Sequence, residues 1–377
     1  MKECNVGIIG FGMQGRKYAE MIGKGDVAGM TLKAIATRSA VKQQEVENQF
    51  SDVDFYLDYH DLLKSRVVDA VIICVPHYYH AEVAAVALEE DVHVLVEKPL
   101  GVYAKQVKPL LELAKTKPNV TFAILFNQRA KPVYQKLNQL LADGEIGNIR
   151  SWSWTMSTVW RPQAYYDQSK WRATWSGEGG GVIINQGSHQ IDLIQWLFGM
   201  PDSVYAHLKY ASQRDIEVDD DATVMFTYDS GMSGVFSTKT HDYFGYDYLE
   251  VHGDKGKIYV HDSEKIVLRK LADKEQEWSK SIANDQITRM HNDPNQFKEK
   301  VIDFGDDSSN QYVTIFENFA EHIQNGISLI APGEEGLHSV EMINAIYLAD
   351  WTKQEVRIPV DPDDYYQRMQ QYIEQHV

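Results

Sequence analysis

The stretch GGGVIINQGSHQID, residues 179–192, places a glycine run before an amide, an imidazole and a carboxylate. Asn185, His189 and Asp192 are spaced four and three residues apart, so on a helix they would share one face. An imidazole titrates at about pH 6.5 and could therefore take a proton from an alcohol under working conditions. The alternative is structural: Asn185 caps a helix, while His189 and Asp192 form hydrogen bonds in the core.

Lys98 lies in a second stretch, VLVEKPL (94–100), directly after an apolar run. If that run is a strand of a parallel sheet, Lys98 stands at the carboxyl edge, where open α/β folds bind ligands. Pro99 biases the turn away from helical geometry. Desolvation would lower the pKa of the lysine, which could then hydrogen-bond a substrate hydroxyl. The alternative is a solvated lysine at a strand end.

The first third of the chain alternates short apolar runs with segments of helical period. Such alternation predicts a parallel sheet covered by helices on both faces. The predicted strands are 5–10, 31–37, 69–75, 93–97 and 120–126. The sequence SWSWTMSTV, which starts at residue 151, alternates polar and apolar side chains and predicts a further strand. The residues after it read as a loop that leads to the glycine run.

Gly10, Gly12 and Gly15 form the pattern G-x-G-x-x-G between the first predicted strand and the first predicted helix. Glycines at these positions permit a tight turn and let main-chain N–H groups approach a pyrophosphate. The pattern alone is weak, but its place in a strand–turn–helix unit predicts a dinucleotide-binding site.

The second predicted strand ends in Thr37, Arg38 and Ser39. An NAD site usually has an acid here, which holds the ribose hydroxyls, and this chain has none. Arg38 between two hydroxyl side chains suits a 2′-phosphate, so NADP(H) is favoured and NAD(H) remains possible. The alternative is that Arg38 is a solvated residue at the start of a helix.

The composition excludes several classes of protein. A formal net charge of −17 disfavours nucleic acid and anionic membranes as partners, because both attract clustered Lys and Arg. With 377 residues, 44% of them hydrophobic, the chain can fold into about two domains. The N-terminal apolar run has no cleavage site and is shorter than the ~18 residues of a membrane span. Cys4 and Cys74 lie beside apolar runs and suggest reduced thiols, so we expect a cytoplasmic protein.

Several motifs occur in an order typical of one family. They are the glycine pattern at 10–15, VPHYYH (75–80), EKP (97–99), FNQR (126–129), the stretch 179–192, YLEVHGDKGKI (248–258) and PGEEGLHSVEMINAIYLA (332–349). Over nearly its whole length the chain resembles the glucose–fructose oxidoreductase/inositol dehydrogenase (Gfo/Idh/MocA) family. The resemblance implies an α/β Rossmann domain with a parallel sheet, and an α+β domain with a large, mostly antiparallel open sheet. We place them at 1–126 and 127–360, with a C-terminal tail at 361–377.

The resemblance also implies an activity. Hydride would pass between a nicotinamide cofactor and a secondary alcohol or ketone of a sugar, an inositol or a sugar derivative, without a metal. The sheet would form a homodimer or homotetramer. Two alternatives stay open: a catalytically silent NAD(P)- and sugar-binding regulatory protein, and a reductase of a non-sugar carbonyl, which would need a more apolar cleft.

The family motifs assign Lys98, His189 and Asn185 to catalysis. Inositol dehydrogenase-like relatives have an acid where this chain has Asn185, and an amide neither carries negative charge nor favours imidazolium formation. We expect His189 to accept the proton and Lys98 to stabilise the oxygen, although these roles could be exchanged. Asp192 would orient the catalytic side chains without touching the substrate, or it would be purely structural.

The residues expected at the cofactor are Gly10, Phe11, Gly12, Met13, Gln14, Gly15, Thr37, Arg38, Ser39, Val75, Pro76, His80, Glu97, Lys98 and Gln128. Those expected at the substrate are Trp171, Arg172, Asn185 and His189. Five tryptophans lie in 151–181, and aromatic faces pack against sugar rings. Arg161 and Arg172 could bind hydroxyls or a phosphate.

Three further segments read as structural. Asp219, Asp220 and Asp221 open a predicted strand and are expected to be solvated rather than bound to a metal. The polar span 270–311 reads as extended surface or loop. The tail after residue 360 is expected to dock as an amphipathic helix on its own subunit or on a neighbour.

Overall fold

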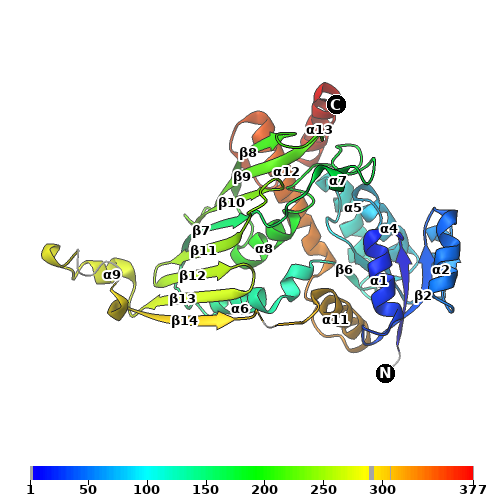
Figure 1. Ribbon diagram of the computed structural model, residues 1–377, viewed down its shortest axis with the longest axis horizontal. Helices are drawn as coiled ribbons and strands as arrows, with labels where there is room; N and C mark the ends of the chain where they lie inside the picture. The colour runs from blue at the N-terminus through cyan, green and yellow to red at the C-terminus, as the bar shows by residue number, and fades with distance from the viewer. Residues whose placement is uncertain (1–2, 288–292, 306, 377) are drawn as a thin grey trace.

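A computed structural model describes residues 3–287, 293–305 and 307–376. The first part of the chain forms a six-stranded parallel sheet with the strand order β3-β2-β1-β4-β5-β6 (Figure 1). This is the order of a Rossmann fold, so the predicted fold class of the first domain is confirmed. Its strands are β1 (Cys4–Ile9), β2 (Met30–Ala36), β3 (Asp54–Tyr56), β4 (Ala70–Ile73), β5 (His93–Val96) and β6 (Phe122–Ile124).

Both faces of this sheet are buried, as continuously apolar strands require. Ile8 and Ile72 pack on one face under α1, α2 and α11, whereas Ile9 and Ile73 pack on the other under α3, α4 and α5. The short strand β3, which lies at the edge of the sheet, was not predicted. The helices are α1 (Met13–Gly23), α2 (Gln43–Gln49), α3 (Tyr59–Lys64), α4 (His80–Glu89), α5 (Ala104–Lys115) and α11 (Gln311–Asn325).

The second sheet has nine strands and is antiparallel at every pairing except that of β7 with β10. The predicted alternation in SWSWTM is confirmed, because Trp152 and Trp154 point into the core while Ser153 is exposed. In chain order the strands are β7 (Ile149–Met156), β8 (Ser203–Tyr210), β9 (Asp219–Thr227), β10 (Ser233–Lys239), β11 (Asp247–Gly253), β12 (Gly256–His261), β13 (Lys265–Leu271), β14 (Phe297–Asp303) and β15 (Val356–Arg357).

In the part of the chain that the structure describes, helices cover one face of this sheet, the face turned toward the first domain (Figure 1). Helix α12 packs on β8 and on α5, so it joins the two domains. The tail forms helix α13, which docks on α5 and α12 of its own chain through the buried Tyr365 and Met369. No helix in the described ranges is long and apolar enough to cross a membrane. The helices of this part are α6 (Pro132–Ala142), α7 (Gln163–Tyr166), α8 (Ser188–Phe198), α9 (Glu275–Ser279), α12 (Gly336–Thr352) and α13 (Pro362–His376).

Two structural expectations are wrong. Asp219 and Asp220 are buried, at 1% and 0% exposed, because main-chain N–H groups of neighbouring turns donate hydrogen bonds to their carboxylates. The span 270–311 contains strand β14, which pairs with β13 along the sheet edge although most of its side chains are exposed. Residues 288–292 and 306 of that span, and residue 377 of the tail, lie outside the described residues.

Candidate active site

The glycine turn between β1 and α1 is shaped for a ligand. A Cβ at Gly10, where φ is +99°, would lie 2.6 Å from the carbonyl oxygen of Cys74, and one at Gly15 would lie 1.9 Å from the carbonyl oxygen of Gly10. A Cβ at Gly12 would meet no atom within 4 Å, so the space above the turn is open. No side chain caps the start of α1. Its first N–H groups can therefore bind a pyrophosphate, and the turn fits a dinucleotide.

Cations gather around this turn. Lys42 donates a hydrogen bond to the carbonyl oxygen of Phe11, and Arg16 forms a bidentate ion pair with Glu45 at 2.6 and 3.0 Å. Arg38, at the carboxyl end of β2, is exposed and lies 5.5 Å from the ring centroid of Tyr79. Lys42 was not predicted, because it follows the strand end by several residues and no motif marks it.

Glu97 and His80 hold the segment that carries Lys98. Glu97 is buried, accepts a hydrogen bond from the hydroxyl of Tyr18 in α1, and accepts another from the main-chain nitrogen of Lys98 at 3.0 Å. Both ring nitrogens of His80 lie 2.6 Å from main-chain oxygens, one of Pro99 and one of Val75. Burial lowers the pKa of His80, and a neutral ring donates to only one of these carbonyls. Both side chains thus tie the lysine segment to its neighbours.

Lys98 reaches across to the glycine-run segment of the second domain. Its Nζ donates a hydrogen bond of 2.8 Å to the main-chain oxygen of Asn185, which also accepts one of 2.9 Å from the hydroxyl of Ser188. Burial lowers the pKa of Lys98, whereas the charges of Glu97 and Glu178 act to raise it. Lys98 is therefore a partly desolvated ammonium with further donors available to a ligand.

His189 lies in the first turn of α8, one residue after Ser188. Burial lowers its pKa well below 6.5, and the nearby charge of Lys98 acts in the same direction. Its Nδ1 is buried without a hydrogen-bond partner among the described residues. The imidazole is thus neutral near pH 7 and can accept a proton. Asn185 does not cap the helix, because α8 begins at Ser188 and its N-cap is Gly187.

Glu178 is the carboxylate of this site, and it was not predicted. It is 2% exposed and accepts hydrogen bonds from the side-chain amide of Asn185 and, at 2.6 Å, from the main-chain nitrogen of Ala173. Nη1 of Arg172 lies 3.6 Å from its Oε1, and Nδ1 of His77 lies 2.9 Å from its main-chain oxygen. Burial raises the pKa of Glu178. The signal available in the sequence was an acid placed inside the glycine run GEGGG.

Two buried carboxylates position these segments. Asp219 accepts hydrogen bonds from the main-chain nitrogens of Gly181 and Ile183 at 2.8 and 2.9 Å, which fixes the glycine run against β9. Asp192 is engaged by Arg129 at 2.6 and 2.9 Å and by Gln195 at 3.0 Å. Asp192 therefore holds α8, and through it His189, rather than orienting the imidazole with its own oxygens.

The remaining predicted residues line the same region from both domains. The ring centroids of Trp171 and His77 lie 6.1 Å apart. The guanidinium carbon of Arg172 lies 5.0 Å from the ring centroid of Trp171. Val75, Pro76 and Gln128 are half-buried at the carboxyl side of β4 and β6. The structure thus connects Lys98 and Arg172 through Asn185 and Glu178, and it places Asp192 behind them.

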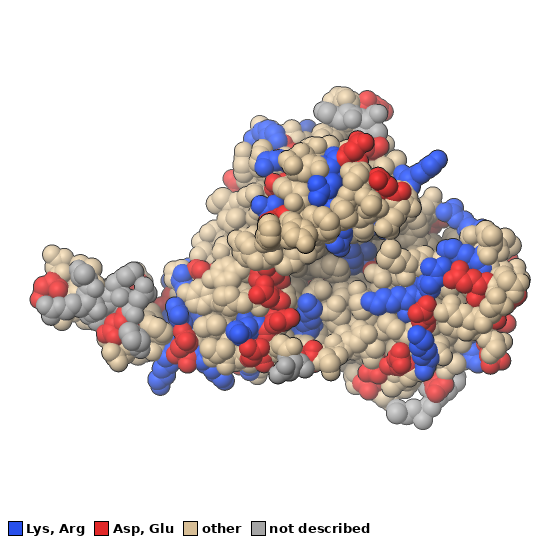
Figure 2. All heavy atoms as spheres, viewed as in Figure 1, with Lys and Arg blue, Asp and Glu red and all other residues tan. Residues whose placement is uncertain are grey.

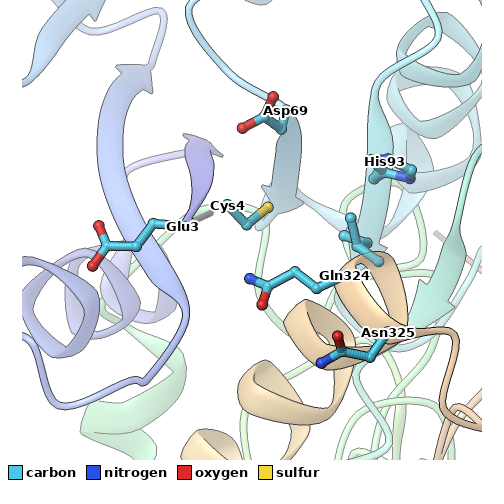
Figure 3. A pocket seen from close by; sticks show the side chains of 7 residues that line it. Glu3, Cys4, Asp69, His93, Gln324 and Asn325 are labelled. Carbon is cyan, nitrogen blue, oxygen red and sulfur yellow. The ribbon is translucent and has the colours of Figure 1, made fainter. Parts of the chain in front are cut away.

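A cavity of about 440 Å³ lies elsewhere, at the amino edge of the first sheet. Figure 3 shows Gln324 and Asn325 of α11 facing the starts of β1 and β4 across it. Lys98 and the glycine turn lie at the carboxyl edge of the same sheet, so this cavity is separate from them. Its lining residues are Glu3, Cys4, Asp69, His93, Ile323, Gln324 and Asn325.

An open glycine turn and a desolvated lysine at the same carboxyl edge of a Rossmann sheet, with a neutral imidazole near the lysine, form the arrangement of a dinucleotide-dependent oxidoreductase. Comparison with known proteins agrees with this class. Residues 4–125 match the model "Oxidoreductase family, NAD-binding Rossmann fold", and residues 134–259 match the model "GFO/IDH/MocA C-terminal domain". Together the two models match more than half of the chain, which belongs to the Gfo/Idh/MocA oxidoreductase family.

Similar proteins extend along most of the chain. A myo-inositol 2-dehydrogenase of Thermotoga maritima is 25% identical and matches 88% of this chain and 91% of its own length. A scyllo-inositol 2-dehydrogenase (NADP(+)) of Bacillus subtilis is 23% identical and matches 90% of this chain and 92% of its own length. Among solved structures, levoglucosan dehydrogenase with NADH and levoglucosan has a TM-score of 0.79 at 21% identity, and the match covers 95% of this chain and 100% of that one. The WlbA dehydrogenase of Bordetella pertussis with NADH and UDP-GlcNAcA has a TM-score of 0.77 at 21% identity, and the match covers 95% of this chain and 100% of that one.

Proposed function

We propose that the protein interconverts a secondary alcohol and a ketone on a sugar, an inositol or a sugar derivative, with Lys98 and His189 acting on the reacting oxygen. The observation that carries the proposal is the desolvated Nζ of Lys98, held against the main-chain oxygen of Asn185 beside a neutral His189. The polar surroundings favour a carbohydrate over an apolar carbonyl compound, because Glu178, Asn185 and Arg172 can all bind hydroxyls.

The chain's own residues supply the acid–base chemistry. The turn at Gly10, Gly12 and Gly15 and the start of α1 would hold a nicotinamide dinucleotide, which would supply or accept the hydride. The neutral imidazole of His189 accepts the hydroxyl proton during oxidation and returns it during reduction. The ammonium of Lys98 donates a hydrogen bond to the oxygen and stabilises the negative charge that develops on it. Asn185, held by Glu178, fixes the position of Lys98 through its main-chain oxygen.

We further propose that NADP(H) is preferred. Thr37, Arg38 and Ser39 present a guanidinium and two hydroxyls at the end of β2, without a carboxylate to bind ribose hydroxyls. Lys42 adds a second cation beside the turn. A 2′-phosphate would gain charge-assisted hydrogen bonds from these groups.

We also propose a cytoplasmic homo-oligomer built on the outer face of the second sheet. A row of directly paired residues crosses that face, and Tyr205, Met225 and Val235 in it are 47%, 46% and 40% exposed. Across the same sheet Tyr259, Val267 and Val301 continue the row. Ser153 and Glu250 separate the two apolar parts of this row. Exposed apolar side chains grouped on one face of a sheet are typical of a protein–protein interface.

Substrate screening with both coenzymes tests the proposed activity. Sugars, inositols, polyols and sugar derivatives are incubated with oxidised coenzyme, and the reduced nicotinamide is measured by its absorbance. We expect turnover of at least one carbohydrate, with a rate for Lys98→Met that is lower by a factor of about 100 or more. Dinucleotide binding without turnover of any compound would instead identify a regulatory protein.

A further inference from the structure

Two arginines share one tyrosine ring beside the proposed catalytic residues. The guanidinium carbons of Arg161 and Arg172 lie 4.9 and 4.5 Å from the ring centroid of Tyr165. Nη1 of Arg172 also donates a hydrogen bond of 2.6 Å to the hydroxyl of Tyr165, and Trp171 lies beside the same guanidinium. Planar guanidinium groups held by aromatic rings are oriented in advance for a ligand with paired oxygens.

The hydrogen-bonding capacity of both arginines is largely unused. Nη1 of Arg161 donates only to the adjacent main-chain oxygen of Trp160, at 3.0 Å. Within the described part of the chain, Nε and Nη2 of both guanidinium groups have no hydrogen-bond partner. Arg172 is 15% exposed, so these donors are poorly compensated by water.

Carboxylates balance this positive charge only in part. Glu178 is the nearest acid to Arg172, at a loose 3.6 Å, and it also receives hydrogen bonds from Asn185 and Ala173. Among the described residues, no carboxylate lies within 4 Å of Arg161. The chain as a whole carries a net charge of −17, so a local excess of cations is unusual here. Figure 2 shows Lys and Arg atoms at the hollow between the two domains.

The arginines are close enough to the reacting centre to serve the same ligand. Contacts run from Arg172 to Glu178, from Glu178 to the side chain of Asn185, and from the main-chain oxygen of Asn185 to Lys98. The charges of Arg172 and Arg161 both act to lower the pKa of Lys98. One sugar-sized molecule could therefore touch Lys98 with a hydroxyl and the arginines with another group.

We infer that Arg161 and Arg172 form an oxyanion clamp, and that the substrate is an acidic sugar derivative with a carboxylate or a phosphate remote from the carbon that is oxidised. The inference rests on the proposed function for the identity of the reacting carbon. A carboxylate or phosphate would supply the missing acceptors and add negative charge, whereas a neutral sugar would leave Arg161 uncompensated and Arg172 with only the shared Glu178. The site would thereby reject neutral sugars of the same shape.

Calorimetric binding to the protein saturated with oxidised dinucleotide tests the clamp without requiring turnover. The probes are matched sets: D-glucose, D-glucuronate and D-glucose 6-phosphate, and D-galactose and D-galacturonate. At least one anionic probe is expected to bind tenfold or more tighter than its neutral parent, and the better anion identifies carboxylate or phosphate as the source. Arg161→Met is expected to remove that preference, and Arg161→Lys, which keeps the charge but not the planar fork, to reduce it. Arg150→Met, at an arginine 56% exposed on β7, serves as the control and is expected to keep it.

The inference is wrong if no anionic probe binds more tightly than its neutral parent, including the case in which none binds. It is also wrong if both Arg161 variants keep the full preference. Turnover of neutral sugars without any preference for anions would overturn the clamp and leave the proposed function intact. A preference for anions without hydride transfer to any of them would support the clamp and overturn the proposed function.

Discussion

The ion pair that holds α8 gives a prediction that can be worked out in free energy. Arg129 and Asp192 have side chains 0% and 1% exposed and meet in two hydrogen bonds of 2.6 and 2.9 Å. Removing one partner of such a pair costs about 3–5 kcal/mol, because the other charge stays buried. Glu335 still contacts Nη1 of Arg129, so Asp192→Asn is expected to fall at the lower end, at about 3 kcal/mol.

Urea unfolding followed by tryptophan fluorescence measures this loss. Trp196 of α8 lies 5.6 Å from the guanidinium carbon of Arg129 and reports on the same region. Because His189 is one helical turn from Asp192, kcat should fall together with the free energy of unfolding. Asp364→Asn is the matched control: its pair with Arg368 is about half exposed, and its loss should cost less than about 0.5 kcal/mol. A loss of unfolding free energy below about 1 kcal/mol in Asp192→Asn would refute the reasoning.

Three further variants test separate parts of the account. Arg38→Asp should weaken NADPH binding at least tenfold relative to NADH, about 1.4 kcal/mol, in a fluorescence titration; unchanged selectivity would remove Arg38 from the cofactor site. Glu178→Gln removes a charge that raises the pKa of Lys98, so the alkaline limb of kcat/KM, where Lys98 loses its proton, should move to lower pH. The exposed Glu217→Gln should leave that limb in place, and an unmoved limb in both variants would contradict the role given to Glu178. Val235→Lys on the outer face of the second sheet should lower the molar mass measured by light scattering; an unchanged mass would place the interface elsewhere.

Local patterns allowed much of the fold to be predicted. Five strands and the glycine turn of the first sheet follow from apolar runs and glycine spacing, which are local properties of the sequence. The edge strands β3 and β14 were missed, because β3 is short and β14 is largely exposed. An exposed edge strand lacks the apolar signal on which such prediction depends.

The site was predictable only where a motif or strand end marks a residue. Lys98, Asn185 and His189 were predicted in this way. Glu178 was missed because no motif marks it, although the donors to its carboxylate, Ala173 and Asn185, lie nearby in the sequence. Asp219 was misread because Gly181, which donates to it, is 38 residues away. Burial of Asp219 depends on donors that the fold brings together, and no short window of sequence contains both.

The central claim is that Lys98 acts on the reacting oxygen during hydride transfer. Its most direct test is the rate of reduced nicotinamide formation by Lys98→Met at saturating coenzyme, with the substrate that screening identifies. The account predicts a kcat lower by a factor of about 100 or more, with coenzyme affinity little changed and Lys108→Met, on the surface of α5, as active as the unmodified protein. A kcat for Lys98→Met within a few-fold of the unmodified protein would contradict it.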